Sequence, residues 1–367
     1  MDAGYEVANV DEIPSPALLV YRDLAKQNVR RTIEIAGGTE RLRPHAKTHK
    51  MTRVAEMELE MGITKQKCAT LQEARMLAEV GVPDVFIAYQ LVGPNAGRLA
   101  HLAQTFPKTT FRTMVDDADA VRALSRAAIS FDITLDLLID LDVGQHRTGI
   151  APGAKAEDLY ALVADLPHVT PGGIHAYDGH NRQENPDERM AACMACLDQV
   201  RSFQAAVEKR GLPVPRRIMG GSISFPCYAQ AQEVETSPGT AVFWDWSYTR
   251  TFKDLPFRAA ALLLSRIVSI PTATRFTIDL GHKAIGADPP QPRGVIWNLD
   301  DTTPTSLQNE EHWVIETPDT SALRVGQPVY VQPAHICPCV ALHRYAYVID
   351  GGGRCTERWQ VTARDRE

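Results

Sequence analysis

Short apolar runs alternate with longer amphipathic runs from residue 14 to about residue 239. Short apolar runs bounded by turn residues predict buried strands, whereas apolar residues repeated every three or four positions predict helices. The predicted strands are residues 18–21, 42–46, the neighbours of 68, 85–89, 110–115, 135–141, 172–177 and 217–220, and the helices between them include 51–61, 71–80 and 187–209. Strands that alternate with helices in this way predict parallel βαβ units, and close to eight of them predict a closed (β/α)8 barrel of the TIM type.

An open, doubly wound sheet is the alternative arrangement of such units. Sheets of that kind usually carry a Gly-x-Gly-x-x-Gly loop after the first strand. No such loop follows residues 18–21, which favours the barrel.

The pattern changes after Pro256. Short strands separated by turn residues are predicted at residues 262–270, 276–280, 295–297, 312–316, 327–332, 345–349 and 359–363. The chain is therefore predicted to be an α/β protein with a barrel over residues 14–250 and a β-domain over residues 251–367. The proline-rich residues 286–293 are predicted to form a surface loop.

Length and charge agree with this organisation. A chain of 367 residues accommodates a barrel of about 250 residues and a smaller domain. With 44% hydrophobic residues it can bury substantial cores. The net charge is −6 and no run of lysine and arginine stands out, which argues against nucleic acid and anionic membranes as partners.

The cysteines and the N-terminal residues indicate the compartment. Seven scattered cysteines, an odd number, are typical of a reducing cytosol rather than of a disulfide scaffold. The first residues lack the basic and apolar regions of a signal peptide. The longest apolar stretch, near residues 259–264, is too short to span a bilayer. We therefore expect a cytoplasmic protein without a membrane partner.

The octapeptide Arg-Pro-His-Ala-Lys-Thr-His-Lys, residues 43–50, carries the first candidate chemistry. Its central Lys47 follows the predicted strand 42–46, and the carboxyl end of a barrel strand points into the mouth where such enzymes do their chemistry. Neighbouring cations make an amine easier to deprotonate, and a neutral lysine can form a Schiff base. The alternative is a basic patch at the start of an ordinary helix. Lys50 is assigned to solvent.

The segment Pro-Ala-His335-Ile-Cys337-Pro-Cys339 carries the second. On an extended chain His335 and Cys337 project to the same side. Imidazole and thiolate suit Zn²⁺, and two protein ligands leave positions open for water or substrate. The alternative is a buried strand with a free cysteine. Cys339 would lie one pleat further along, either as a core thiol or as a third ligand.

The two motifs together resemble the metal-activated pyridoxal-phosphate (PLP) enzymes of the D-threonine aldolase and D-serine dehydratase family, which share the alanine-racemase-like fold (fold type III). The motifs stand in the family's order, and the similarity spans most of the chain. It includes residues 66–67, 92–94, 142–149, 176–179, 220–222, 239–240 and 279–281. The resemblance also implies that roughly residues 1–20 belong with the β-domain.

The resemblance implies a PLP site in the barrel, with Lys47 as the Schiff-base lysine. A Gly-Ser or Gly-Thr pair after a strand offers backbone N–H groups and a hydroxyl to a phosphate, although such pairs also occur in plain turns. The implied PLP contacts are Gly221, Ser222, Gly239, Thr240, Tyr177 and Arg147. For Tyr177 the alternative is a packed core tyrosine, and for Arg147 it is a surface salt bridge.

His335 and Cys337 are the implied ligands of a divalent metal, Zn²⁺ or Mn²⁺, with Mg²⁺ as a third option. The metal would hold the substrate's carboxylate and β-hydroxyl and act as a Lewis acid. His180 and Asp178, just past Tyr177, are candidates for substrate contact, with plain loop residues as the alternative. Cys193 and Cys196 are assigned to core packing.

The function that the resemblance implies is a lyase acting on small D-β-hydroxy-α-amino acids. We favour the D-threonine aldolase type, in which the Cα–Cβ bond breaks to give glycine and an aldehyde. The alternative is a D-serine or D-3-hydroxyaspartate dehydratase, which gives an oxo acid and ammonia and to which the His-x-Cys pattern is similar. An amino-acid racemase and a non-catalytic PLP carrier are less favoured. A racemase does not need a pair of metal ligands, and the carrier proteins lack a second domain. A homodimer is expected by analogy.

Overall fold

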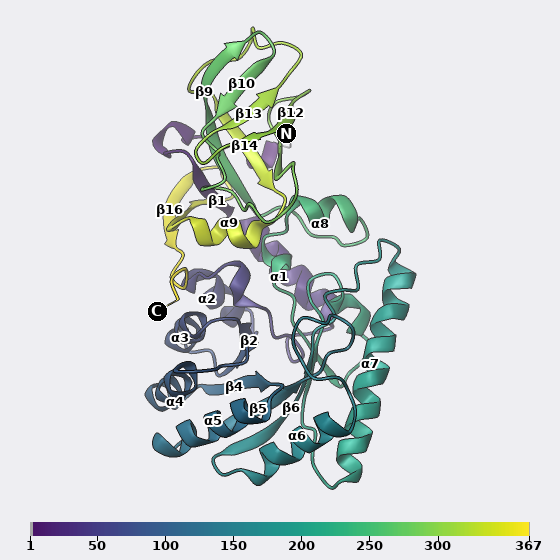
Figure 1. The fold of residues 1–367 in the computed structure, drawn as a ribbon. Coiled ribbons are helices and arrows are strands. Elements are labelled where there is room, and N and C mark those ends of the chain that lie inside the picture. Colours follow the sequence, from purple (N-terminus) through teal and green to yellow (C-terminus); the bar gives the residue numbers. More distant parts are fainter. Residues whose placement is uncertain (1–2, 367) are drawn as a thin grey trace. The chain divides into compact units, whose positions relative to one another are not determined.

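The computed structural model describes residues 3–366 and divides into two compact units (Figure 1). The barrel unit comprises residues 32–47, 55–239 and 365–366, and the β-unit comprises residues 3–31, 48–54 and 240–364. The boundary expected near residue 250 stays a prediction. No helix in the described part of the chain is long and apolar enough to cross a membrane.

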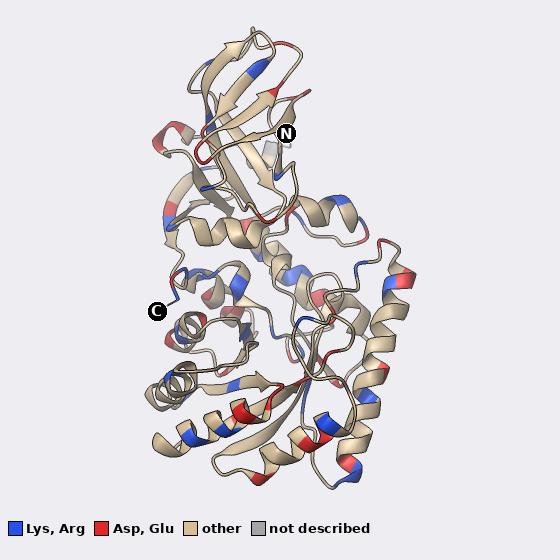
Figure 2. Cartoon of the chain, viewed as in Figure 1, with Lys and Arg blue, Asp and Glu red and all other residues tan. Residues whose placement is uncertain are grey.

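The barrel unit is built on a parallel sheet of seven strands in the order β2-β3-β4-β5-β6-β7-β8. Helices alternate with the strands, and charges of both signs are interspersed along the helices α5 to α7 (Figure 2). The predicted α/β barrel-type fold with a β-rich C-terminal part is confirmed. The strands are β2 Lys65–Cys68, β3 Asp84–Ile87, β4 Thr110–Val115, β5 Leu135–Asp140, β6 Val169–Ala176, β7 Arg217–Met219 and β8 Val234–Thr236. The helices are α1 Arg22–Ala36 and α2 Thr52–Glu60, each shared with the β-unit, then α3 Leu71–Val80, α4 Asn95–Thr105, α5 Ala118–Ser130, α6 Ala154–Asp165 and α7 Pro186–Lys209.

Residues 42–45 occupy the place of the missing eighth strand, between β8 and β2. Leu42 forms a single bridge to Thr236, and His45 forms a single bridge to Lys67. The strand predicted at residues 42–46 is therefore wrong as a continuous strand. Pro44 has no N–H to give to a ladder, and the chain turns into a short 3₁₀ helix, Ala46–Thr48, at Lys47.

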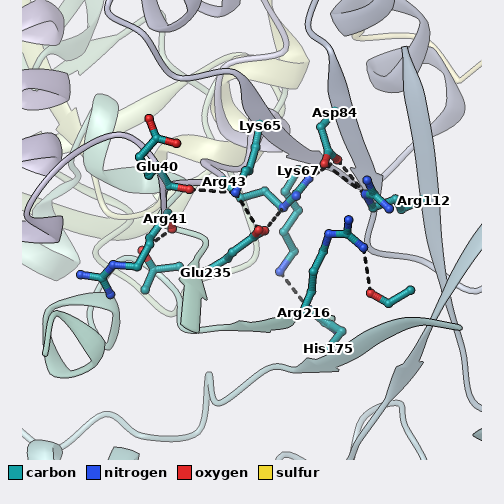
Figure 3. Close-up of polar contacts among 12 residues, drawn as sticks. Glu40, Arg41, Arg43, Lys65, Lys67, Asp84, Arg112, His175, Arg216 and Glu235 are labelled. Carbon is teal, nitrogen blue, oxygen red and sulfur yellow. Dashed lines mark hydrogen bonds and ion pairs between the residues drawn. The ribbon is translucent and has the colours of Figure 1, made fainter. Parts of the chain in front are cut away.

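The barrel interior is layered. Phe86, Met114, Leu138 and Ile218 form an apolar layer inside the sheet. Buried ion pairs lie at the amino ends of the strands, where Arg43 contacts Asp84 and Glu235 (Figure 3). The amino end of a barrel serves stability and the carboxyl end serves chemistry, so the functional side chains are expected at the other end of the same strands.

The β-unit is built on a nine-stranded sheet whose main path runs β12-β13-β10-β9-β1-β15-β16, with β14 pairing β9 and β11. Its first strand β1 pairs with β9 and β15, so the N-terminal residues belong to this sheet rather than to the barrel. Its strands are β1 Ala17–Tyr21, β9 Ala261–Thr272, β10 Arg275–Ile278, β11 Gly294–Ile296, β12 Thr303–Gln308, β13 Trp313–Glu316, β14 Pro328–Pro333, β15 Tyr345–Ile349 and β16 Cys355–Gln360, and its helices are α8 Trp246–Thr251 and α9 Ile336–Leu342.

Replacement of Gly173 by alanine is expected to destabilise the barrel. Gly173 lies in β6 at a φ of +119°, and an added Cβ would lie 2.3 Å from the carbonyl oxygen of Arg216. Gly153 is a matched control, because its φ is +144° but nothing lies within 4 Å of an added Cβ. We expect Gly173→Ala to lower the free energy of unfolding by about 1–3 kcal/mol more than Gly153→Ala. Urea unfolding of both variants measures this, and equal losses would contradict it.

Candidate active site

Lys47 is presented at the carboxyl end of the barrel. It is exposed within the 3₁₀ helix Ala46–Thr48, while the residues on either side of it are buried. The ring nitrogen Nδ1 of His45 accepts a hydrogen bond from the Lys47 backbone N–H at 3.3 Å. His49 likewise accepts from the backbone of Met51 at 3.1 Å, and burial lowers the pKa of His49 to about 3. His45 therefore supports the backbone at Lys47, and His49 supports the backbone at Met51.

A second lysine, Lys67 of β2, lies buried at the same end of the barrel. Its Nζ is 2.9 Å from Nε2 of His175 in β6 (Figure 3), and Nδ1 of His175 is 2.6 Å from the carboxylate of Asp140 in β5. Burial and the charge of Lys47 lower the pKa of Lys67 to about 7. No sequence pattern predicted this row, because its members are spread over three strands.

Tyr177 and Arg147 lie together, as the resemblance implies for two PLP contacts. The Arg147 guanidinium lies 4.9 Å from the centre of the Tyr177 ring. Two glycines make room for that ring, because an added Cβ at Gly179 would lie 2.3 Å from it and one at Gly221 would lie 3.2 Å from it. The contact with Tyr177 accounts for the position of Arg147 without the surface salt bridge that was the alternative.

The two turns expected to hold a phosphate, at residues 220–222 and 239–240, are joined by a hydrogen bond. The Ser222 hydroxyl accepts a hydrogen bond from the Gly239 N–H at 3.0 Å, and Gly220 adopts a φ of +75°, which favours glycine. Thr240 follows Gly239 directly and belongs to the β-unit, where its hydroxyl lies 3.6 Å from the Cys337 sulfur.

Asp178 stabilises the turn at residues 220–222 through hydrogen bonds. It is fully buried, and one carboxylate oxygen accepts from Ser224, whose hydroxyl in turn accepts from the Gly221 N–H, both at 2.9 Å. Its other oxygen accepts from the Tyr228 hydroxyl at 2.7 Å. The structure thus assigns Asp178 to the support of the loop. His180 is exposed and packs over Gly144, where an added Cβ would lie 2.9 Å from its ring.

His335 and Cys337 lie at the start of α9, not on an extended chain. His335 precedes the helix Ile336–Leu342 and Cys337 lies in its first turn. The expected alternation of side chains is therefore wrong, yet the two side chains still share a hydrogen bond. The Cys337 sulfur also lies 3.3 Å from the hydroxyl of Thr48, the residue after Lys47.

Asp288 contacts His335 from the loop 286–293, which the sequence marked only as surface. One carboxylate oxygen lies 2.5 Å from Nδ1 of His335, so the other ring nitrogen is the one available to a ligand. Burial lowers the pKa of His335, but Cys337 and Asp288 outweigh it and raise that pKa to about 9. An acidic residue in a proline-rich loop gives no pattern that predicts this contact.

Cys339 is a buried thiol within α9. Its sulfur accepts from the Gly286 N–H at 3.1 Å and donates to the His335 carbonyl at 3.0 Å, because residues four apart share one face of a helix. Within residues 3–366 no group of three or more histidine, cysteine, aspartate or glutamate side chains is placed to hold a metal. Cys193 and Cys196 are buried in α7, as expected.

Two family matches together cover most of the chain. Residues 20–245 match the family described as alanine racemase, N-terminal domain. The chain belongs to this family. Residues 260–349 match the family described as putative serine dehydratase domain.

This alanine racemase family member is similar along most of its length to proteins named as aldolases. It is 29% identical over 329 residues to a D-threonine aldolase of Arthrobacter sp, covering 88% of this chain and 85% of the relative. It is 26% identical to a 3-hydroxy-D-aspartate aldolase of Paracoccus denitrificans, covering 100% and 97%. The solved D-threonine aldolase of Filomicrobium marinum is 28% identical with a TM-score of 0.90, covering 99% of each chain.

Relatives named as D-threo-3-hydroxyaspartate dehydratase and D-serine dehydratase also match, at 25% and 20% identity. The predicted resemblance to the D-threonine aldolase and D-serine dehydratase family is therefore confirmed. The relatives include both reaction types, so the choice between aldolase and dehydratase needs a separate argument.

Proposed function

We propose that this protein is a PLP- and divalent-metal-dependent lyase of D-β-hydroxy-α-amino acids, of the D-threonine aldolase type. The observation that carries the proposal is the pairing of an imidazole and a thiol at His335 and Cys337, fixed by Asp288, in a chain that presents Lys47 at a barrel mouth. A racemase needs no such pair. Similarity to aldolases over 85% or more of their length supports the reaction type.

The chain has residues that fit PLP, all but Thr240 in the barrel unit. Lys47 would bind it covalently, Tyr177 and Arg147 would contact its ring, and Gly221, Ser222, Gly239 and Thr240 would hold its phosphate. The glycines beside Tyr177 let the backbone approach its ring closely, and the hydrogen bond between Gly239 and Ser222 holds the two turns together, as a phosphate-binding site requires. When bound, PLP supplies the electron withdrawal that stabilises negative charge on the substrate.

The β-unit has residues that fit a divalent metal. His335 would give one ring nitrogen, with Asp288 holding the other, and Cys337 would give its sulfur. A nitrogen and a sulfur donor favour Zn²⁺ over Mg²⁺, although Mn²⁺ remains an option by resemblance. The metal would supply Lewis acidity toward the substrate's hydroxyl and carboxylate. The chain links the two sets of residues covalently, at Lys47–Thr48 and Gly239–Thr240.

Dehydration is the second candidate reaction. The His-x-Cys pattern resembles the D-serine and D-3-hydroxyaspartate dehydratases, and relatives with those names match the chain at lower identity. In that reaction Lys47 would take the α-proton. His180 stays a candidate for substrate contact, and a homodimer stays an expectation.

Product identification separates these reactions. The purified protein, loaded with PLP and Zn²⁺ or Mn²⁺, is incubated with D-threonine, D-allo-threonine, D-serine and D-3-hydroxyaspartate, each with and without EDTA. We expect glycine and an aldehyde, lost on addition of EDTA. Oxo acid and ammonia would replace the aldolase by the dehydratase, and full activity in EDTA would contradict the metal.

Loss of either proposed ligand is expected to release the metal. His335→Ala and Cys337→Ser should each weaken metal binding by at least about 10²-fold, because even outer contacts of a ligand contribute 10- to 100-fold. Cys355→Ser is the control, since Cys355 lies on β16 and hydrogen-bonds the Glu357 carbonyl. Metal content after dialysis, and titration of the apo-protein with Zn²⁺, measure the effect. Wild-type affinity in both ligand variants would refute the assignment.

A further inference from the structure

The buried Lys67 has no role in the binding of PLP or metal described above. It is 3% exposed, and its backbone bridges His45, two residues before Lys47. Apart from His175, its amine faces the rings of Phe86 and Tyr177, with Nζ 5.9 and 5.8 Å from their centres. Burying an amine is costly, so its presence at the mouth needs an explanation.

The hydrogen bonds of Asp140 and His175 determine which atom carries each proton. The Asp140 carboxylate can only accept, so Nδ1 of His175 carries the proton that it receives at 2.6 Å. Nε2 of His175 then has a lone pair and accepts from Lys67 at 2.9 Å. The second oxygen of Asp140 accepts from the Thr148 hydroxyl at 2.9 Å. Asp140 and His175 are thereby each held in one protonation pattern, with Lys67 at the end of the row.

The charges around Lys67 allow both protonation states near neutral pH. Burial, Lys47 and Arg147 lower its pKa, whereas Asp140 and Asp178 raise it, and the balance is a pKa of about 7. His175 is kept neutral, since burial and the charge of Lys67 lower its pKa. A lysine with a pKa near the working pH is suited to proton transfer.

We propose that Lys67 exchanges a proton with the cofactor bound at Lys47, with His175 and Asp140 as the residues that position it. One proton leaves the Lys67 ammonium, the amine becomes neutral, and the bound group gains one positive charge. The reverse transfer restores the ammonium. This inference rests on the proposed PLP site. The competing explanation is that Lys67 is a fixed positive charge that balances Asp140 and Asp178.

A pH titration of the cofactor's absorption spectrum distinguishes the two. The PLP-loaded protein is titrated in EDTA, without substrate, as wild type, Lys67→Met, Lys67→Arg, Asp140→Asn and Lys65→Met. Lys65 is the matched control because it lies two residues away on β2, paired with Glu235 at the opposite end of the barrel. Lys67→Arg keeps the charge but cannot release a proton near neutral pH.

We expect a spectral transition near pH 7 in wild type and in Lys65→Met, and its loss in both Lys67 variants. In Asp140→Asn the midpoint should fall by about one pH unit, because the Asp140 charge favours the protonated amine. A wild-type transition in Lys67→Arg would overturn the proposal and leave the fixed-charge explanation. A wild type without a transition near neutrality would also overturn it. A wild type that forms no cofactor band at all would instead refute the proposed PLP site.

Discussion

Lys47→Ala is expected to abolish stable PLP binding and to lower the rate of substrate cleavage by about 10³-fold or more. Lys47 is the exposed amine at the mouth of the barrel, where its backbone is held by His45. Removal of a covalent or proton-transferring side chain costs on the order of 10²–10⁴-fold, and the cofactor would lose its attachment as well. Cofactor absorbance after gel filtration and product formation measure the two effects.

Lys50→Ala is the matched control for this experiment. Lys50 lies three residues on, and its amine is 3.4 Å from the Ala363 carbonyl within the β-unit. The control should retain the cofactor band and activity within a few-fold of wild type. Equal losses in the two variants, or retention of PLP by Lys47→Ala, would contradict the assignment of Lys47.

Arg43→Ala is expected to have the largest effect on stability. Arg43 is fully buried, with its guanidinium 2.6 Å from Asp84 and 2.8 Å from Glu235, and Arg112 and Lys65 complete the network (Figure 3). Its removal leaves two largely buried carboxylates, 17% and 12% exposed, each with one of its cationic partners lost. Breaking a buried ion pair in this way costs about 3–5 kcal/mol, which corresponds to a fall in Tm of roughly 6–10 °C.

Arg275→Ala provides the comparison. Arg275 pairs with Glu316 at 2.7 Å, but both side chains are about half exposed. An exposed pair contributes about 0–1 kcal/mol, so this variant should keep nearly the wild-type Tm. Calorimetry of the three proteins tests the contrast, and a similar Tm for Arg43→Ala and Arg275→Ala would show that the barrel does not depend on the buried network.

The sequence predicted the parts of the fold and site that depend on local pattern. Alternating strands and helices gave the barrel, and the motif around Lys47 gave the candidate lysine. The segment at residues 42–46 was mispredicted as a strand, because Pro44 and the turn at Lys47 interrupt the ladder. The extended His-x-Cys segment was mispredicted because seven residues of helix are too short for helical periodicity to show.

The contacts that the sequence did not predict join residues far apart in the chain. Lys67 and His175 are 108 residues apart, and Asp288 and His335 are 47 apart. Nothing in the residues near Lys67 indicates that its amine turns inward to a histidine. Such contacts follow from the register of the barrel strands and from the course of a loop, which only the folded chain fixes.

Reductive trapping of the cofactor tests whether Lys47 is the residue that binds PLP. The PLP-loaded protein is reduced with borohydride, digested, and analysed by peptide mass spectrometry to find the lysine that carries the pyridoxyl group. We expect modification of Lys47, with Lys67 and Lys50 unmodified. Modification at Lys67 or Lys50, or at no lysine of the barrel, would contradict the account of this site.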